Sequence, residues 1–193
     1  MSAITERRER ERAHRHQLIV TAARELAEAE GWEAVTTRRL AERVEYSQPV
    51  LYSHFNGKDA IVRAVALDGF GELAAHLRRA RQTAPEQGQA LRAVCRAYLA
   101  FATERPALYQ AMFVLPTDLK FASTETPPPL RACFDEFVSC FRPDNERREL
   151  FAEVTWSAVH GMAVLSDSGR IPPDGQEERL DFLVTRIADT STD

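Results

Sequence analysis

Residues 36–58 read TTRRLAERVEYSQPVLYSHFNGK, and this stretch decides the fold. Its first half places apolar residues at helical spacing behind Thr36, a residue type that often caps helix N-termini. Its second half begins with Ser47 as another cap, and Pro49 fits the first turn because a missing N–H costs little there. The stretch therefore predicts two short helices joined by a tight turn.

The second of these helices has an apolar edge and an outer face suited to DNA. Leu51 and Phe55 lie four residues apart, so both point the same way, toward a core. The residues left on the outer face are Gln48, Val50, Tyr52, Ser53 and His54. A short helix with such a face suits the major groove, and the pair of helices has the arrangement of a helix-turn-helix.

The same stretch resembles the signature of the TetR/AcrR family of bacterial transcriptional regulators, T-x-R-x-(I/L)-A-x-x-x-G-V-S-x-x-x-(L/I)-Y-x-H-F-x-x-K. The run Leu51-Tyr52-x-His54-Phe55, followed by Lys58, carries most of the resemblance. Upstream, over the first third of the chain, the match continues through Ile19, Ala22, Ala23, Leu26, Gly31 and Trp32. The resemblance implies an all-α fold, in which an N-terminal three-helix helix-turn-helix domain precedes a larger helical bundle for effector binding and dimerisation.

One residue departs from the family pattern. Glu45 stands where the family usually has Gly, at the end of the first helix of the pair. A helix often ends in a left-handed residue, and Glu adopts that conformation less readily than Gly. The position therefore predicts some strain in the turn, and a carboxylate that repels DNA.

The resemblance also assigns roles in DNA binding, residue by residue. Base contacts are expected from Gln48, Pro49 and Val50, since Gln can bond adenine and Val can pack on a thymine methyl group. The residues expected to reach phosphates or groove edges are Thr37, Arg38, Tyr52, His54 and Lys58. For Arg39, Arg43 and Ser53, contact with DNA and exposure to solvent both stay open.

The first sixteen residues are rich in arginine. Five arginines, at positions 7, 8, 10, 12 and 15, are accompanied by only three glutamates and by two histidines. One interpretation is a solvated helix end with internal Glu–Arg pairs. The other is an arm that touches backbone phosphates or the minor groove.

Bulk composition excludes several classes of protein. The 193 residues carry a net charge of −4, which argues against a protein that coats nucleic acid indiscriminately. No segment reaches the roughly 18 apolar residues of a membrane span, and the N-terminus is too charged for a signal peptide. We therefore expect a cytoplasmic protein with no membrane association.

The three cysteines fit reduced thiols, because they are odd in number and widely spaced. Cys133 and Cys140 lie seven residues apart on one expected helix face, where core packing is the first interpretation and a thiol sensor the alternative. No Cys/His spacing resembles a zinc site, so neither a metal nor a cofactor is expected.

Helical periodicity predicts about nine helices and no strand. The expected helices outside the reader pair span residues 6–30, 58–82, 88–104, 106–114, 130–141, 145–167 and 175–189, and residues 116–129 are expected to form a loop. This division suggests a DNA-binding domain over residues 1–57 and an effector-binding and dimerisation domain over residues 58–193.

The C-terminal half carries a second resemblance and a candidate dimer surface. Residues 155–161, TWSAVHG, resemble the Trp…His-Gly motif for which one class of TetR-family C-terminal domains is named. Ser157 and Gly161 are small and one turn apart, so a partner helix could approach closely. The candidate dimer residues are Ser157, Gly161, Leu180, Leu183, Val184 and Ile187, some of which must face the protein's own core.

Family members commonly bind a small molecule inside the C-terminal bundle, which implies a hydrophobic or aromatic effector here. The candidate lining residues are Tyr98, Phe101, Tyr109, Met112, Phe113, Phe134, Phe137, Trp156 and His160. Aromatic residues at helical spacing also occur as plain core, so that alternative stays open for each of them. For His160 the alternative is a hydrogen bond to a neighbouring carbonyl group.

These observations predict a ligand-responsive, homodimeric repressor that binds a palindromic operator in double-stranded DNA. One alternative is a nucleoid-type or constitutive DNA-binding protein without an effector. A helical-bundle enzyme is a further alternative, but no nucleophile–base pair, Gly-rich phosphate loop or E-x-x-H pair supports it. The chain is therefore not expected to be an enzyme.

Overall fold

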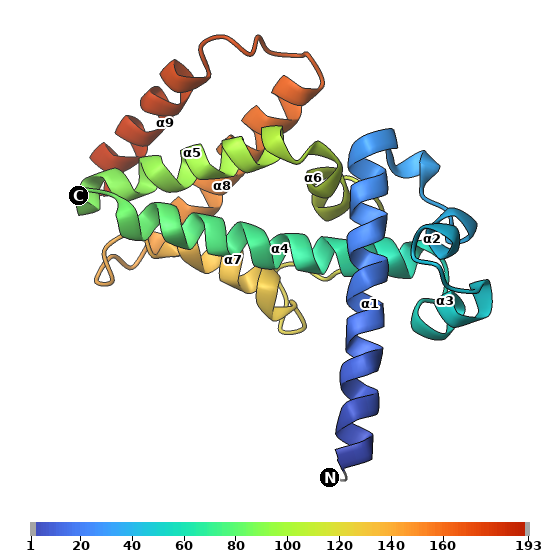
Figure 1. Cartoon of the computed structure of the whole chain (residues 1–193). Coiled ribbons are helices and arrows are strands. Elements are labelled where there is room, and N and C mark those ends of the chain that lie inside the picture. The colour runs from blue at the N-terminus through green and yellow to red at the C-terminus, as the bar shows by residue number, and fades with distance from the viewer. Residues whose placement is uncertain (1–2, 192–193) are drawn as a thin grey trace. The chain divides into compact units, whose positions relative to one another are not determined.

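The computed structural model describes the backbone of residues 3–191, and the side chains in this range except those of residues 3, 87 and 189–191. All regular structure in the described range is helical, which confirms the all-α prediction (Figure 1). The elements are α1 (Ala3–Glu30), η1 (Trp32–Ala34), α2 (Thr37–Arg43), α3 (Gln48–His54), α4 (Lys58–Thr83), η2 (Gln87–Gln89), α5 (Ala90–Glu104), α6 (Pro106–Phe113), α7 (Pro128–Val138), α8 (Arg148–Asp167) and α9 (Gln176–Ser191).

The chain divides into two compact units that alternate along the sequence. The first unit comprises the residues up to 69 and residues 105–119, and the second comprises residues 70–104 and the residues from 120 onward. Both units draw on α4, whose first turns belong to the first unit and whose later turns belong to the second. The expected functional division at residues 57 and 58 is a separate matter and stays a prediction.

In the first unit, the second half of α1 contributes a buried face. Ile19, Ala23 and Leu26 are almost completely buried, and α1 contacts η1, α2 and α6. Leu40 of α2 and Leu51 of α3 are both fully buried, as expected from their helical spacing. The apolar residues at the sequence positions identified above therefore form the core that holds α2 and α3.

The short helix α6 joins the first unit although it lies far along the chain. The Glu28 carboxylate accepts hydrogen bonds from the backbone N–H groups of Ala107 (3.2 Å) and Leu108 (3.0 Å). The Trp32 indole N–H donates to the carbonyl oxygen of Ala107 at 2.8 Å. Because the first N–H groups of a helix have no partner within it, the Glu28 carboxylate satisfies two groups that α6 leaves open.

Gly69 of α4 lets α6 approach closely. A Cβ atom at this position would lie 2.8 Å from Leu108 Cδ1 and 2.7 Å from Met112 Sδ, both closer than van der Waals contact allows. Leu108 and Met112 are both buried, so these side chains have little room to shift.

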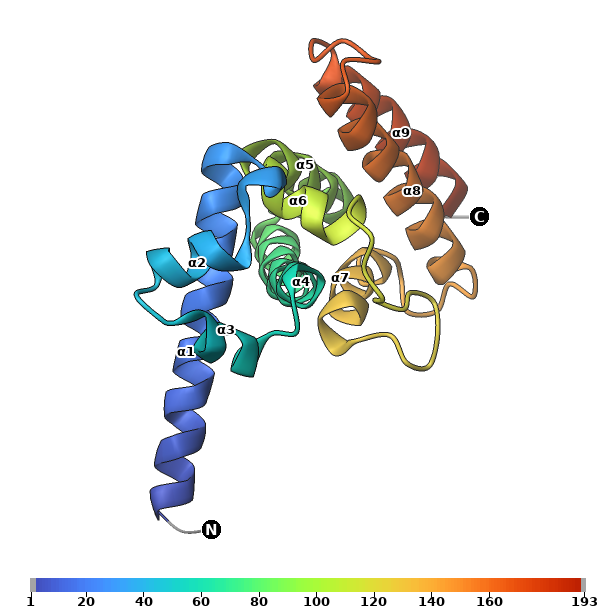
Figure 2. The ribbon, with the colours of Figure 1, turned by 90° about the vertical axis from the view of Figure 1, so that its right-hand side faces the viewer.

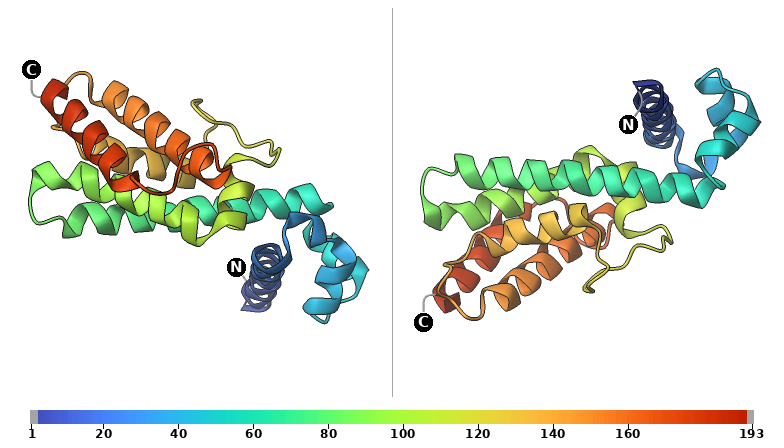
Figure 3. Two further views of the ribbon diagram at one scale, coloured as in Figure 1. Left: turned by 90° about the horizontal axis from the view of Figure 1, so that it is seen from above. Right: turned by 90° about the horizontal axis from the view of Figure 1, so that it is seen from below.

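In the second unit, α5 contacts α7, α8 and α9. The helices α8 and α9 pack against each other and lie side by side in two different views (Figures 2 and 3). Tyr98 and Phe101 of α5, Phe137 of α7, Val159 of α8 and Leu180 of α9 are all at most 1% exposed and form much of this core.

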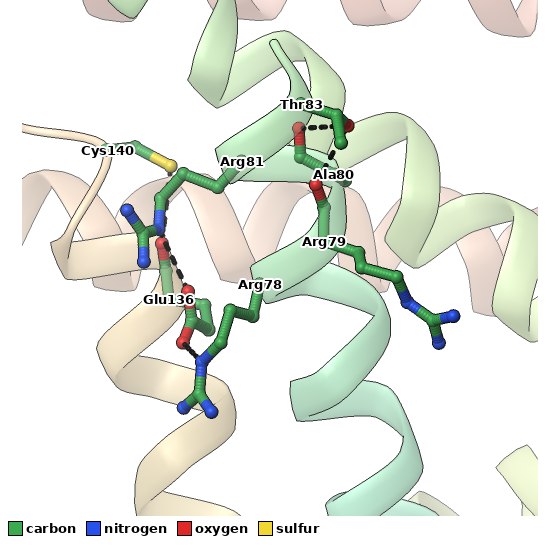
Figure 4. Close-up of polar contacts among 7 residues, drawn as sticks. All are labelled: Arg78, Arg79, Ala80, Arg81, Thr83, Glu136 and Cys140. Atoms are coloured by element: carbon green, nitrogen blue, oxygen red, sulfur yellow. Dashed lines mark hydrogen bonds and ion pairs between the residues drawn. The ribbon is translucent and has the colours of Figure 1, made fainter.

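A buried carboxylate fixes α7 to the later turns of α4. Glu136 of α7 is only 3% exposed. Its two carboxylate oxygens accept hydrogen bonds from the Nε atoms of Arg78 (2.8 Å) and Arg81 (2.9 Å), both on α4 (Figure 4). Since a buried charge is tolerated only when it is paired, the two guanidinium groups offset the cost of burying Glu136.

Most helix boundaries agree with the expected ones to within two or three residues. The clearest difference is α7, which spans Pro128–Val138 where residues 130–141 were expected. After Val138 the chain turns tightly, with bonds from Cys140 N to Phe137 O (3.1 Å) and from Phe141 N to Val138 O (3.1 Å). Among the described residues, no helix is long and apolar enough to cross a membrane.

Candidate functional site

The helices α2 and α3 form the predicted pair. Thr36 caps α2, because its hydroxyl oxygen accepts a hydrogen bond from the backbone N–H of Arg39 at 3.2 Å. Ser47 precedes α3 as predicted, but its side chain makes no capping hydrogen bond. Leu51 and Phe55 are buried at 0% and 3% exposure, which confirms that one edge of α3 faces the core.

Glu45 occupies the left-handed conformation predicted for its position. Its φ angle is 57°, between the end of α2 and the start of α3. Its N–H donates to Glu42 O at 3.3 Å, and the N–H of Tyr46 donates to Ala41 O at 2.9 Å. These two bonds form a Schellman motif, in which the left-handed residue is usually Gly. A residue with a Cβ atom is strained in this conformation, as the sequence comparison with the family pattern indicated.

The residues predicted to contact bases lie at the start of α3. Gln48 and Pro49 are exposed, whereas Val50 is half-buried. Their neighbour Tyr52 is 53% exposed, although large aromatic side chains are more often buried. An exposed phenol beside an exposed amide on one short helix can contact both bases and phosphates.

The residues predicted to contact phosphates differ in what they bind within the protein. The hydroxyl groups of Thr37 and Tyr52 lie 3.4 Å apart, so α2 and α3 present them together. Arg38 pairs with Glu42 at 3.0 Å on the surface of α2. The Lys58 ammonium group donates to the carbonyl oxygen of Trp32 at 2.5 Å, which ties the start of α4 to η1.

The three residues whose role was left open all have partners within the protein. The Arg39 guanidinium group binds both carboxylate oxygens of Glu30, at 2.9 and 2.7 Å. Arg43 pairs with Glu25 at 2.9 Å. The hydroxyl group of Ser53 donates to the carbonyl oxygen of Val50 at 2.6 Å.

His54 lies where α3 meets α1. Burial lowers the pKa of His54, and the positive charges of Arg12, His16 and Arg15 lower it further. The ring of His16 stacks on Phe55 with a centroid distance of 4.4 Å, and it lies 6.5 Å from the ring of His54. Sequence reasoning did not assign His16 a place, although its position three residues before Ile19 puts it near the buried face of α1.

A hydrogen-bonded aromatic cluster lies in the second unit. The Trp156 indole N–H donates to the hydroxyl oxygen of Tyr98 at 3.2 Å, and this hydroxyl lies 3.1 Å from His160 Nδ1. Burial lowers the pKa of His160, which favours the neutral imidazole near pH 7. Because a Tyr hydroxyl that accepts from Trp156 still has its own proton to donate, a neutral Nδ1 is a matching acceptor.

The other candidate lining residues are divided between the two units. In the second unit, Phe137 packs edge-on against Tyr98 (5.9 Å between ring centroids) and Phe134 against Trp156 (6.4 Å). Phe101 of α5, also in the second unit, packs edge-on against His76 of α4 at 5.8 Å. The candidates of the first unit are Tyr109, Met112 and Phe113, all on α6.

Comparison with known proteins assigns the family. Residues 19–65 match the sequence profile described as "Bacterial regulatory proteins, tetR family", and residues 91–187 match that of the "Tetracyclin repressor-like, C-terminal domain". The second match alone covers half of the chain. The chain belongs to the TetR family of transcriptional regulators. Neither profile tests the narrower Trp-His-Gly class, which stays a prediction.

Individual relatives of this TetR-family chain are distant. It is 33% identical over 96 residues to YobS, an uncharacterized HTH-type transcriptional regulator of Bacillus subtilis, and this match covers 49% of each chain. It is 25% identical over 175 residues to Rv0681, an uncharacterized HTH-type transcriptional regulator of Mycobacterium tuberculosis (88% of this chain, 78% of the relative). The chain thus spans about half the length of YobS, the first of these relatives.

A solved structure confirms the TetR-like fold. A protein of unknown function from Rhodococcus sp. RHA1 superposes with a TM-score of 0.74 over 92% of this chain and 95% of its own, at 21% sequence identity. An identity this low establishes the shared fold and nothing about the ligand.

The candidate dimer residues of this TetR-family protein fall into two groups. Leu180 and Val184 of α9 are buried at 0% and 9% exposure, so they pack within their own unit. Ser157 of α8 is exposed, and no atom lies within 4 Å of a Cβ built on Gly161. Leu183 and Ile187 of α9 are half-buried.

Large apolar side chains surround the small residues of α8. Leu150, Val154 and Leu165 are 45%, 46% and 39% exposed. Their spacing places them on the same side of α8 as Ser157 and Gly161. These five residues form an exposed apolar stripe, called the α8 stripe below.

The cysteines are held as thiols in apolar surroundings. Burial raises the pKa of Cys133 and of Cys140 to about 12, and it also raises the pKa of Cys95. The Cys133 thiol donates to the carbonyl oxygen of Phe70 at 2.9 Å, and the Cys140 thiol to that of Glu136 at 3.2 Å. Within the described residues, no group of three or more His, Cys, Asp or Glu side chains could hold a metal ion.

Proposed function

We propose that the chain is a repressor that binds a palindromic operator as a homodimer and leaves it when a small hydrophobic or aromatic effector binds. The observation that carries the proposal is the asymmetry of α3. Its edge formed by Leu51 and Phe55 is buried, while Gln48, Pro49 and Tyr52 are exposed. A regulator of this kind acts on DNA in the cytoplasm and needs no catalytic activity.

Sequence readout is proposed for the start of α3. Gln48 would bond adenine through its amide, and Val50 would pack on a thymine methyl group beside Pro49. Thr37 and Tyr52 support a joint phosphate contact, because their hydroxyl groups lie 3.4 Å apart. Arg38, His54 and Lys58 are the remaining phosphate contacts of the proposal.

Selection from a pool of random duplexes by the purified protein tests this readout. We expect enrichment of a palindromic site, because a two-fold dimer presents two copies of α3. Replacing Gln48 with Ala is expected to relax the preference at one position of each half-site by about 1–3 kcal/mol. Ser53→Ala is the control, because the Ser53 hydroxyl is bonded to the carbonyl oxygen of Val50 on the same helix. Recovery of no preferred sequence would refute the proposal.

Lys58 requires a separate test, since its ammonium group already donates to Trp32 O. An ammonium group has three donors, so two stay available for a phosphate. If it binds phosphate, Lys58→Ala weakens binding equally for all sequences and flattens the dependence of log K on log salt by about one unit per protomer. A purely structural Lys58 would lower the stability of the protein and leave this slope unchanged.

Dimerisation is proposed to use the α8 stripe, with Leu183 and Ile187 of α9 at its margin. Burying an exposed apolar side chain contributes about 25 cal/mol per Å² of apolar surface. Small residues such as Ser157 and Gly161, between larger ones, allow a second helix to approach along the stripe. A dimer in equilibrium sedimentation at micromolar concentration is expected, whereas a monomer would contradict this part of the proposal.

The effector is proposed to bind at the aromatic cluster of Tyr98, Trp156 and His160, next to Phe134 and Phe137. Trp156, His160 and Phe134 are half-buried, so each keeps some accessible surface. The cluster combines aromatic faces with a phenol–imidazole pair, which suits an aromatic molecule that also carries a hydrogen-bonding group.

A thermal-shift screen with aromatic compounds, repeated on Tyr98→Phe, tests the effector site. The variant keeps the ring and removes the hydroxyl group that lies between Trp156 and His160. A compound that stabilises the wild type and releases the selected DNA should do both less well with Tyr98→Phe. Equal effects on both proteins would place the effector elsewhere.

A further inference from the structure

The first turns of α1 extend beyond the core of the first unit. Residues 4–15 are all exposed, and the first buried residue of α1 is Ile19 (Figure 1). Because an α-helix rises about 1.5 Å per residue, this exposed segment is a rod about 18 Å long. It is helical from Ala3 onward. The arginine-rich start is therefore a helix and not an extended arm.

Three arginines of this rod share one face. Arg8, Arg12 and Arg15 are spaced by four and three residues, which places them in a row along the helix. Ile19 continues the same row into the core. At 100° per residue, the glutamates at positions 6, 9 and 11 fall on the flanks or on the opposite side. We call Arg8, Arg12 and Arg15 the arginine row.

The charges of the arginine row are not neutralised within the protein. In the part of the chain that the structure describes, none of the three arginines forms an ion pair. Other arginines of the same unit do, as Arg7 does with Glu11 at 3.0 Å and Arg39 with Glu30 at 2.7 Å. An unpaired row of guanidinium groups fits a polyanion better than an isolated ion, because it offers several charges along a line.

The arginine row is continuous with the proposed reader helix. His16, directly after Arg15, stacks on Phe55 at the end of α3 with a centroid distance of 4.4 Å. Arg12 and Arg15 are close enough to His54 for their charges to act on its imidazole ring. In two views at right angles, α3 lies alongside α1, and the first turns of α1 project past it (Figures 1 and 2).

We propose that the arginine row is a second DNA contact, which binds backbone phosphates beside the bases that α3 reads. The inference rests on the proposed function, because it requires α3 to be in the major groove. Guanidinium groups bind phosphate oxygens through paired N–H donors, and the rigid helix holds these donors at a fixed spacing before DNA is bound. DNA rises about 3.4 Å per base pair, so a rod of about 18 Å reaches roughly five base pairs.

Two double variants with equal loss of charge test this contact. Arg12→Gln/Arg15→Gln removes two members of the row, whereas Arg7→Gln/Arg10→Gln removes two arginines from the other faces of the same helix. Each protein is titrated with the duplex that the wild type selects, once trimmed to the selected site and once extended by six base pairs at both ends. Each titration is repeated between 50 and 200 mM salt.

We expect only the row variant to lose the benefit of the longer duplex. Two phosphate contacts per protomer, four per dimer, correspond to a change of about 3.6 in the slope of log K against log salt. The advantage of the wild type over the row variant should therefore shrink by about 100-fold from 50 to 200 mM salt. The control variant should follow the wild type on both duplexes.

The outcomes separate this inference from the proposed function. If the wild type selects a sequence and the two double variants bind both duplexes alike, the arginine row is not a DNA contact and the proposed function stands. If the wild type selects no sequence, the proposed function fails and the inference fails with it. A helical circular dichroism signal equal to that of the wild type verifies that each variant is folded.

Discussion

Replacing Gly161 with Ala separates a dimer surface from a merely exposed helix face. A Cβ atom built on Gly161 has no atom within 4 Å, and the same is true of Gly71 on α4. Both glycines are helical, so Ala at either position should stabilise the folded protomer by about 1 kcal/mol through helix propensity. The two substitutions differ only if a partner helix crosses α8 at Gly161.

Such a crossing would bring the new methyl group against the partner backbone. Adding a methyl group to a well-packed interface costs about 1–3 kcal/mol. The dissociation constant of the dimer should then rise between about 5-fold and 150-fold with Gly161→Ala. Gly71→Ala should leave this constant unchanged, because Gly71 lies outside the α8 stripe.

Sedimentation of a dilution series measures the dissociation constant, and urea unfolding of the same samples measures stability. The reasoning predicts weaker dimerisation for Gly161→Ala together with an unimpaired helical protomer. If Gly161→Ala and Gly71→Ala dimerise as tightly as the wild type, no helix approaches α8 closely at Gly161. The α8 stripe would then have to be replaced by another surface in the proposed dimer.

Three further predictions follow from single side chains. Glu45→Gly should stabilise the protein by roughly 0.5–1 kcal/mol in urea unfolding, since relief of a left-handed Glu outweighs the entropy of Gly, while Glu45→Gln should bring no such gain. Glu136→Gln should destabilise it by about 1.5–3 kcal/mol, because the charged partner of Arg78 and Arg81 is lost, and the exposed Arg79→Gln serves as control. Cys133 and Cys140, whose pKa values burial raises to about 12, should stay protonated at pH 8 and react slowly with a disulfide reagent until denaturant is added, so rapid reaction of the native protein would contradict their burial.

Local signals in the sequence were sufficient for the reader pair. The cap at Thr36, the spacing of Leu51 and Phe55, and the departure at Glu45 are all properties of a few adjacent residues. The structure bears out each of them, including the left-handed φ of 57° at Glu45. Such features follow from backbone sterics and helical periodicity, which act within one or two turns.

Long-range packing was not accessible in the same way. The bond between Glu28 and Ala107 joins residues 79 positions apart, and no local pattern connects them. For this reason the aromatic residues of α6 and those of α5 entered one set of effector candidates although they belong to different compact units. The end of α7 was also missed, because apolar Phe141 continues the helical pattern while the backbone after Val138 already turns.

The attachment of α6 bears on how regulators of this type can be recombined. A chimera that joins residues 1–57 of this chain to the C-terminal part of a relative keeps Glu28 and Trp32 but exchanges the helix to which they bond. The recipient would need backbone groups at the same place, or two orphaned side chains would remain in the transplanted head. Exchange of effector specificity is therefore expected to succeed when residues 105–119 travel with the N-terminal segment. In this protein the transferable piece is discontinuous in the gene, although it is contiguous in space.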